Sequence, residues 1–363
     1  MSLTGGQRHE NGPVNDSGSV RTQVDSPIPA PNTEAVAAQD PTTAILAWVW
    51  HMRYRTTASF RALWIVSLAF TLVGVALISI ADIDNALRWI PLVVGNLLPT
   101  AVILSPMSNY RWVRWGLDQV NTHPWRSVPA RVLHHGRWKA VIEVVDTTGT
   151  PVVLTVRIDP AHLAMITDSV LLVIGRSEWA VLRVPGSREL FPAKVRGPFP
   201  AGEAVDLSGT DVTGRWAQVL RDRLLWNFLQ IPVTFAVLLV FWWASTISLV
   251  WFASCAVLLV LLVVLLSRHR FSDFRLPGLV RAGEWVRVDA ALDPWKARRD
   301  GTASATATLR FADGTTRTAE LSAATVDLLG AIFDNSAVWV AGTGDHVAVG
   351  FPGYPLVASA RLR

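Results

Sequence analysis

The longest uncharged run, residues 224–267, limits the possible folds of this chain more than any other feature. It contains 44 residues without Asp, Glu, Lys or Arg. As a single helix it would be about 66 Å long, roughly twice the hydrocarbon thickness of a bilayer. A break at Ala244-Ser245-Thr246 therefore predicts two membrane spans, near 225–243 and 248–266.

Two earlier apolar stretches, 62–81 and 89–107, have the length of further spans, although Pro91, Gly95 and Pro99 weaken the second. Half of the residues are apolar and only 17% are charged, a balance that is unusual for ordinary globular domains. The sequence thus predicts four transmembrane helices arranged as two hairpins.

Positive charge on one side of these spans predicts their orientation, because Lys and Arg concentrate on the cytoplasmic side of membrane proteins. Twelve arginines flank the four outer ends, whereas the loop 82–88 carries one Arg. We therefore expect a multi-pass protein of the inner (plasma) membrane with cytoplasmic N- and C-termini. The twelve are Arg53, Arg55, Arg61, Arg111, Arg114, Arg126, Arg215, Arg221, Arg223, Arg268, Arg270 and Arg275.

Residues 126–196 alternate between apolar and polar with the period of β-strands. Asp159-Pro160 predicts the start of a short helix over 161–166, with Asp159 as its N-cap. Three strands, a helix and two strands is the order of a small OB-like barrel. The predicted strands are Val128–Leu133, Ala140–Val145, Val152–Ile158, Val170–Ile174 and Trp179–Val184, with Leu190–Arg196 as an extension.

The same order recurs near the C-terminus, with strands near 284–291, 303–311, 315–321, 337–341 and 346–351 and a helix over 323–332. VPGSRELFPAKVR (184–196) and FPGYPLVASARLR (351–363) share Pro-Gly and a basic end, as expected for equivalent final strands. The predicted fold class is thus an α+β membrane protein, a tandem repeat in which each helical hairpin precedes an OB-like barrel.

The predicted domain boundaries follow from these segments. A polar N-terminal stretch without an apolar core predicts a disordered tail rather than a signal peptide. The predicted units are a tail (1–40), a juxtamembrane segment (41–61), hairpin one (62–107), β-domain one (108–196), a linker with a juxtamembrane helix (197–223), hairpin two (224–267) and β-domain two (268–363).

Motifs for chemistry are absent from the sequence. It contains no phosphate-binding GxxxxGK[ST], no HExxH and no GxSxG. Cys255 is the single cysteine, and the adjacent His134 and His135 point to opposite faces of a strand. The sequence therefore predicts no catalytic residue, no metal site and no cofactor, and hence not an enzyme.

One pattern recurs in the loop between the first two strands of each repeat, where Trp adjoins Lys with Arg nearby. Such loops form part of the ligand-binding face of OB-like barrels, and Trp with cations suits an anionic headgroup, an acidic partner or a stacked base. The alternative is a solvated loop, and nucleic acid is the least favoured ligand. The candidate residues are Arg137, Trp138, Lys139, Trp295, Lys296, Arg298 and Arg299.

Asn96 is the one strongly polar residue near a predicted bilayer midplane, and it marks either a pore site or an interhelical hydrogen bond. The predicted function is a non-enzymatic membrane scaffold or accessory subunit that presents two β-domains. The alternative is a pore or transporter component. Expected partners are membrane lipids and an unidentified protein, and a homo-oligomer is compatible with the sequence.

Overall fold

The computed structural model describes residues 26–55, 65, 112–113, 116–145, 149–174, 178–196, 204–207, 209–244, 253–254, 257, 260–261, 264–265 and 267–363. Asn96 and Cys255 lie outside these residues. So do the predicted span 89–107, all of 62–81 except Ile65, and much of 248–266.

The first β-domain is a closed barrel of six strands, all paired antiparallel, in the order β1-β2-β3-β6-β5-β4. A short helix, α4 (Pro160–Leu163), connects β3 to β4, and the Asp159 carboxylate accepts from the backbone N–H groups of Ala161 and His162. The predicted N-cap is thereby confirmed. The strands are β1 (Arg126–His135), β2 (Ala140–Val145), β3 (Pro151–Val156), β4 (Ser169–Ile174), β5 (Trp179–Arg183) and β6 (Phe191–Arg196).

The second β-domain repeats this topology as a closed antiparallel barrel in the order β7-β8-β9-β12-β11-β10. The helix α8 (Val326–Asn335) again joins the third strand to the fourth, and the Thr325 side chain caps it. The strands are β7 (Val286–Leu292), β8 (Thr302–Arg310), β9 (Thr316–Thr325), β10 (Ala337–Ala341), β11 (His346–Phe351) and β12 (Leu356–Leu362).

Each barrel has six strands, one more than the five expected before the final stretch of each repeat. The expectation that 184–196 and 351–363 hold equivalent final strands is confirmed, because they contain β6 and β12. Strand β6 pairs with β3 on one side and β5 on the other. Because it bridges these two strands, it closes the sheet and leaves no unpaired edge there.

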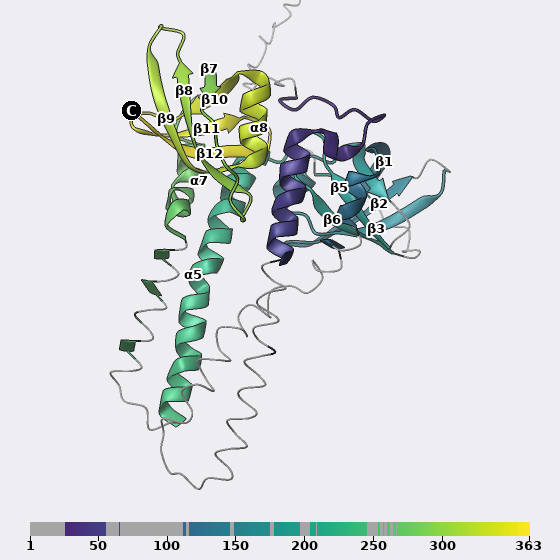
Figure 1. The fold of residues 1–363 in the computed structure, drawn as a ribbon, viewed down its shortest axis with the longest axis horizontal. Coiled ribbons are helices and arrows are strands. Elements are labelled where there is room, and N and C mark those ends of the chain that lie inside the picture. The colour runs from purple at the N-terminus through teal and green to yellow at the C-terminus, as the bar shows by residue number, and fades with distance from the viewer. Residues whose placement is uncertain are drawn as a thin grey trace, which may run out of the picture.

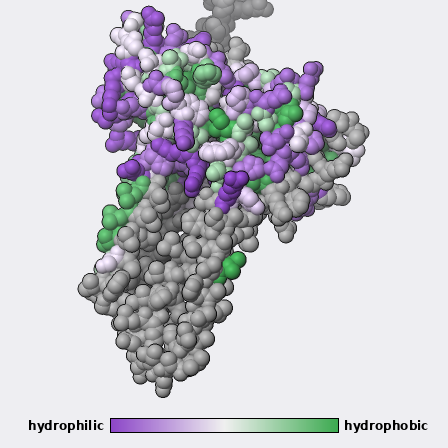
Figure 2. All heavy atoms as spheres, in the orientation of Figure 1, coloured by the Kyte–Doolittle hydropathy of each residue, from purple (hydrophilic) through white to green (hydrophobic). Residues whose placement is uncertain are grey.

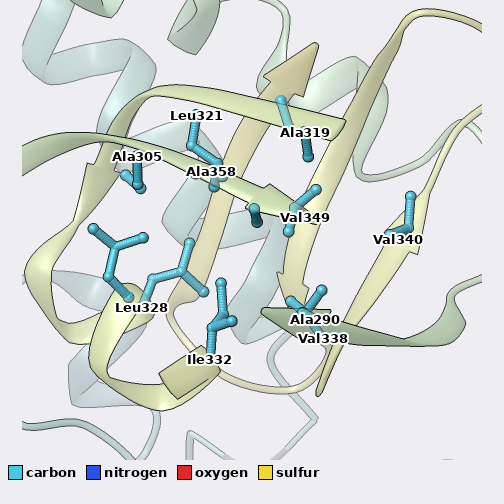
Figure 3. Close-up of a cluster of buried hydrophobic side chains, with 14 of the residues drawn as sticks. Ala290, Ala305, Ala319, Leu321, Leu328, Ile332, Val338, Val340, Val349 and Ala358 are labelled. Carbon is cyan, nitrogen blue, oxygen red and sulfur yellow. The ribbon is translucent and has the colours of Figure 1, made fainter. Parts of the chain in front are cut away.

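Small side chains fill the second barrel, and α8 covers one end of it (Figure 1). Figure 3 shows Leu328 and Ile332 of α8 directed toward Ala305, Ala358 and Val349 of the strands. A six-stranded barrel has a narrow interior, so many of its core positions are alanine or valine, with larger side chains such as Leu309, Leu321 and Phe351 among them.

Residues 26–55 pack against both barrels, which corrects the predicted disordered tail for positions 26–40. Ile28 is buried in the core of the second barrel, and the Asn335 side chain donates to the carbonyl of Pro27. The 3-10 helix η1 (Ala37–Gln39) and a helix over 41–55 lie against the first barrel and η3 (Leu117–Asn121). In Figure 1 this helix lies between the first barrel and α8.

The long helix α5 (Val212–Ala244) starts between the barrels and runs away from them (Figure 1). Val212, Trp216 and Leu220 recur at helical spacing and pack with α4 and the second barrel. The 3-10 helix η4 (Arg268–Phe274) and the short helix α7 (Leu276–Leu279) return the chain to the second barrel. Figure 2 shows mainly hydrophilic residues on the barrel surface facing the viewer, with hydrophobic ones scattered among them.

Within the part of the chain that the structure describes, no helix has both the length and the apolar character needed to cross a membrane. This finding contradicts the predicted fold class with four transmembrane helices in two hairpins. It also contradicts the predicted membrane scaffold, the alternative pore or transporter, and the multi-pass inner-membrane localisation. The prediction depended on the length of uncharged runs, and length alone does not establish what a segment packs against.

Candidate functional site

The two Pro-Gly turns that mark the repeat meet at the junction of the barrels. Gly186 and Gly353 hold equivalent places before β6 and β12, and both have left-handed backbones, with φ of 76° and 88°. Gly186 packs on the ring of Tyr354, the residue that follows Gly353. Thr213 at the start of α5 accepts from Gly353 N at 2.8 Å and donates to Tyr354 O at 3.2 Å. The repeated turns therefore join the barrels to α5.

A buried polar network crosses the same junction. The His162 ring places Nδ1 2.9 Å from the Asp159 carboxylate and Nε2 3.2 Å from Ser187 Oγ. Ser187 Oγ in turn donates to Asp327 of α8 at 2.5 Å, and the Arg188 N–H donates to the same carboxylate oxygen at 2.8 Å. All five residues are buried. The network thus connects α4 of the first repeat to α8 of the second.

The Asp159–His162–Ser187 arrangement has the spacing of a nucleophilic triad but not its chemistry. In a triad the serine hydroxyl donates to the histidine, which then acts as the base. Here the shorter contact of Ser187 Oγ is with Asp327, and the hydroxyl is fully buried. We therefore assign these residues to the structure of the junction.

The Asp159 carboxyl is held ionised within this network. Burial by itself would raise its pKa, but the charge and hydrogen bonds of His162 and the charge of Arg223 outweigh burial and lower the pKa to about 2. The stability that this carboxylate contributes is therefore present above its unfolded-state pKa, near 4, and disappears as the pH falls toward 2.

We expect Asp159→Asn to remove the pH-dependent stabilisation that the ionised carboxylate provides. By linkage this stabilisation is about 2 kcal/mol. Asparagine still caps α4, so the helix itself is preserved. Urea unfolding of both proteins from pH 7 to pH 2 measures the effect, as a smaller decrease in unfolding free energy for the variant below pH 4. Identical pH profiles would show that Asp159 is not held in this way.

A cavity of about 740 Å³ adjoins the network and lies between the two barrels. The helix 41–55 contributes one wall, the first barrel a second, and α5 a third. Asp300 and Gly301 before β8, Thr302 at its start, and Arg270 of η4 complete the lining. Segments that are distant in sequence therefore border one cavity, which is partly open to solvent.

Tryptophan rings and guanidinium groups alternate around this cavity. The Arg223 guanidinium lies 5.1 Å from the ring centre of Trp216 and 5.9 Å from that of Trp138. Arg53 lies 5.4 Å from the ring centre of Trp50. Among the described residues the buried Trp216 Nε1 has no hydrogen-bond partner. Packing against an indole face orients a guanidinium group and keeps its N–H donors off the ring, where they can bind other groups.

The charges that line the cavity are unequal, with five guanidinium groups against four carboxylates. Three carboxylates have cationic partners: Asp222 with Arg137 at 3.2 Å, Asp159 with Arg223 at 3.4 Å, and Asp300 with His269 at 3.0 Å. The lining groups are Arg53, Arg137, Arg157, Arg223 and Arg270, and Asp159, Glu189, Asp222 and Asp300. The lining thus holds one more guanidinium group than carboxylates, and Arg270 also pairs with Asp273 of η4 at 3.1 Å.

The fourth carboxylate, Glu189, is partly buried. Burial raises its pKa, with the nearby Asp327 acting in the same direction, while His162, Arg53 and Arg223 oppose this shift. The Arg53 guanidinium is itself desolvated, which lowers its pKa, and Glu189 and Asp300 counteract that effect.

The first predicted loop borders this cavity. Arg137 and Trp138 belong to its lining, whereas Lys139 is exposed and does not. The Trp-Lys pairing is therefore divided between a cavity wall and the outer surface.

The second predicted loop is part of the barrel junction. Trp295 packs against the cores of both the second barrel and the N-terminal helix cluster. Arg298 donates from Nη1 to the Ser322 carbonyl at 2.8 Å, and the Arg299 carbonyl accepts from Arg53 Nε at 2.8 Å. Lys296 is exposed, and a partner contact there stays a prediction.

Sequence reasoning missed most of the cavity. Trp50 and Arg53 are three residues apart on one helix, and Trp216 and Arg223 are seven apart on another, so each pair shares a helix face. That spacing is a usable signal, but the sequence analysis interprets Arg53 and Arg223 as flanks of membrane spans. Among the residues with a described placement, no group of three His, Cys, Asp or Glu could hold a metal ion.

No protein-family model, curated protein or solved structure matches the chain.

Proposed function

We propose that this chain is a non-enzymatic binding protein whose two barrels enclose a site for a small organic acid with an aromatic or planar ring. The observation that carries the proposal is the cavity itself, which is partly open to solvent and is lined by tryptophan rings and five guanidinium groups. Its volume of about 740 Å³ suits a small molecule.

The lining chemistry supports an acid in particular. Guanidinium groups bind carboxylate, phosphate and sulfonate oxygens through paired N–H donors, and their hydrogen bonds are stronger where water is excluded. The indole rings of Trp50, Trp138 and Trp216 supply apolar walls against which a ring can pack. A cavity of this volume favours a small ligand over an extended polynucleotide, which binds along a longer groove.

Calorimetric titration of the purified protein at pH 7 with two matched probes tests the proposal. We expect 3-(2-naphthyl)propionate to bind, and 2-(2-naphthyl)ethylamine, its cationic counterpart, to bind at least tenfold more weakly. The ring is the same in both, so the difference reports charge alone.

Arg223→Gln should weaken binding of the naphthylpropionate about tenfold or more, because a charged hydrogen bond contributes about 1.5–3 kcal/mol. The matched control is Arg317→Gln on the exposed surface of β9, which should bind like the parent. Equal affinity for the two probes, or equal losses in the two variants, would overturn the proposal.

A further inference from the structure

Glu189 differs from the other acids of the cavity. Its backbone N–H donates to Ser187 Oγ at 3.0 Å, which fixes the chain at the cavity wall. Among the described residues, however, its carboxylate makes no hydrogen bond or ion pair, whereas Asp159, Asp222 and Asp300 each do. Glu189 is partly buried, and its carboxylate oxygens are not among the fully buried polar atoms, so they are reached from the cavity that the residue lines.

The surroundings of Glu189 do not neutralise it by contact. Arg53 from the helix 41–55 donates instead to the backbone carbonyls of Arg299 and Asp300. Arg223 of α5 pairs with Asp159, as does His162 of α4, and Asp327 of α8 adds a further negative charge. The carboxylate therefore remains available to a group that enters the cavity.

We propose that the ligand is amphoteric, an aromatic or planar acid that also carries a protonated amine, and that Glu189 accepts hydrogen bonds from this amine. The inference rests on the proposed function, since guanidinium groups of the lining hold the acid while Glu189 holds the ammonium. In this arrangement the Glu189 carboxylate gains a partner. Glu189 also selects against simple acids, because its negative charge repels an anion that brings no cation with it.

A third probe with the same ring tests this inference. L-3-(2-naphthyl)alanine differs from 3-(2-naphthyl)propionate by its α-ammonium group alone. We expect the amino acid to bind the full-length protein about tenfold more tightly, as measured by calorimetry at pH 7.

Glu189→Gln should reverse this preference. Binding of naphthylalanine should weaken about tenfold, while binding of naphthylpropionate stays the same or strengthens. Glu284→Gln, which changes an exposed acid before β7, is the matched control and should keep the preference. The glutamine variant should also unfold at a higher temperature than the parent near neutral pH, because burial raises the pKa of Glu189 and its ionisation therefore destabilises the fold.

The outcomes separate the two proposals. If naphthylpropionate binds and naphthylalanine binds no more tightly, the role of Glu189 is overturned and the organic-acid site stands. If the preference for naphthylalanine persists in Glu189→Gln, the amine binds elsewhere and the inference is also overturned. If neither acid binds, the proposed function itself fails.

Discussion

Replacing Asp327 with alanine is expected to lower the free energy of unfolding by about 3–5 kcal/mol, because it leaves buried partners without their counter-charge. Its Oδ2 accepts from Ser187 Oγ and from the Arg188 N–H. It is also the main countercharge of the buried Arg183, whose pKa burial lowers to about 10 even though Asp327 and Asp40 oppose that shift. The acid in ion-pair contact with that guanidinium is Asp40, at 3.8 Å.

Asp334→Ala is the matched control, since Asp334 lies on the same helix and pairs with the Arg188 side chain but is partly exposed. Partly exposed pairs contribute about 1 kcal/mol or less, so this variant should be near parental stability. Urea unfolding followed by tryptophan fluorescence measures both. Similar losses in the two variants would mean that the network does not hold the barrels together.

Replacing Gly186 with alanine should lower the free energy of unfolding by about 2–4 kcal/mol, from backbone strain and overpacking combined. Its φ of 76° is unfavourable for a residue with a Cβ. The new Cβ would also lie 2.5 Å from Cε1 of Tyr354 and 2.9 Å from Cε of Met165. The ring of Tyr354 must then move away from the first barrel.

Gly353→Ala separates the two effects. Gly353 has a similar φ of 88°, but a Cβ there would meet no atom within 4 Å. We expect it to lose about 1–2 kcal/mol from strain alone. Thermal and urea unfolding of both variants give the comparison, and the excess loss in Gly186→Ala measures the contact between the repeats. Equal losses would show that the turns meet without contributing to stability.

These two junction contacts also border the proposed site, because Glu189 lies two residues after Ser187 in the β5–β6 connection and its backbone N–H donates to the Ser187 hydroxyl. A change that separates the barrels should therefore weaken ligand binding in proportion to its effect on the junction. The charge-matched probes provide the measurement in the Gly186→Ala variant, with Gly353→Ala as its control.

Local patterns in the sequence predicted much of the two barrels. Alternation gave β2 (Ala140–Val145) its observed bounds, and Asp159-Pro160 identified the cap of α4. The shared Pro-Gly pairs identified equivalent turns, both with a left-handed glycine. Such features depend on residues that are close in sequence, because strand alternation, helix caps and turns are satisfied by the backbone nearby.

Tertiary structure alone decided the remainder. Six-strand closure depends on β6 pairing with both β3 and β5, and no short pattern specifies both partners. The packing of Ile28 in the second barrel is equally non-local. Hydropathy assigned residues 224–267 to membrane spans because it measures the composition of a run and not its neighbours.

The cavity shows most clearly why sequence was insufficient. Arg53, Glu189 and Arg223 come from three separate segments, and only the packing of the two barrels with α5 and the N-terminal helix brings them around one space. These charged groups affect one another only because they lie close together. Coulomb interactions and desolvation depend on distance and burial, which the order of residues does not specify.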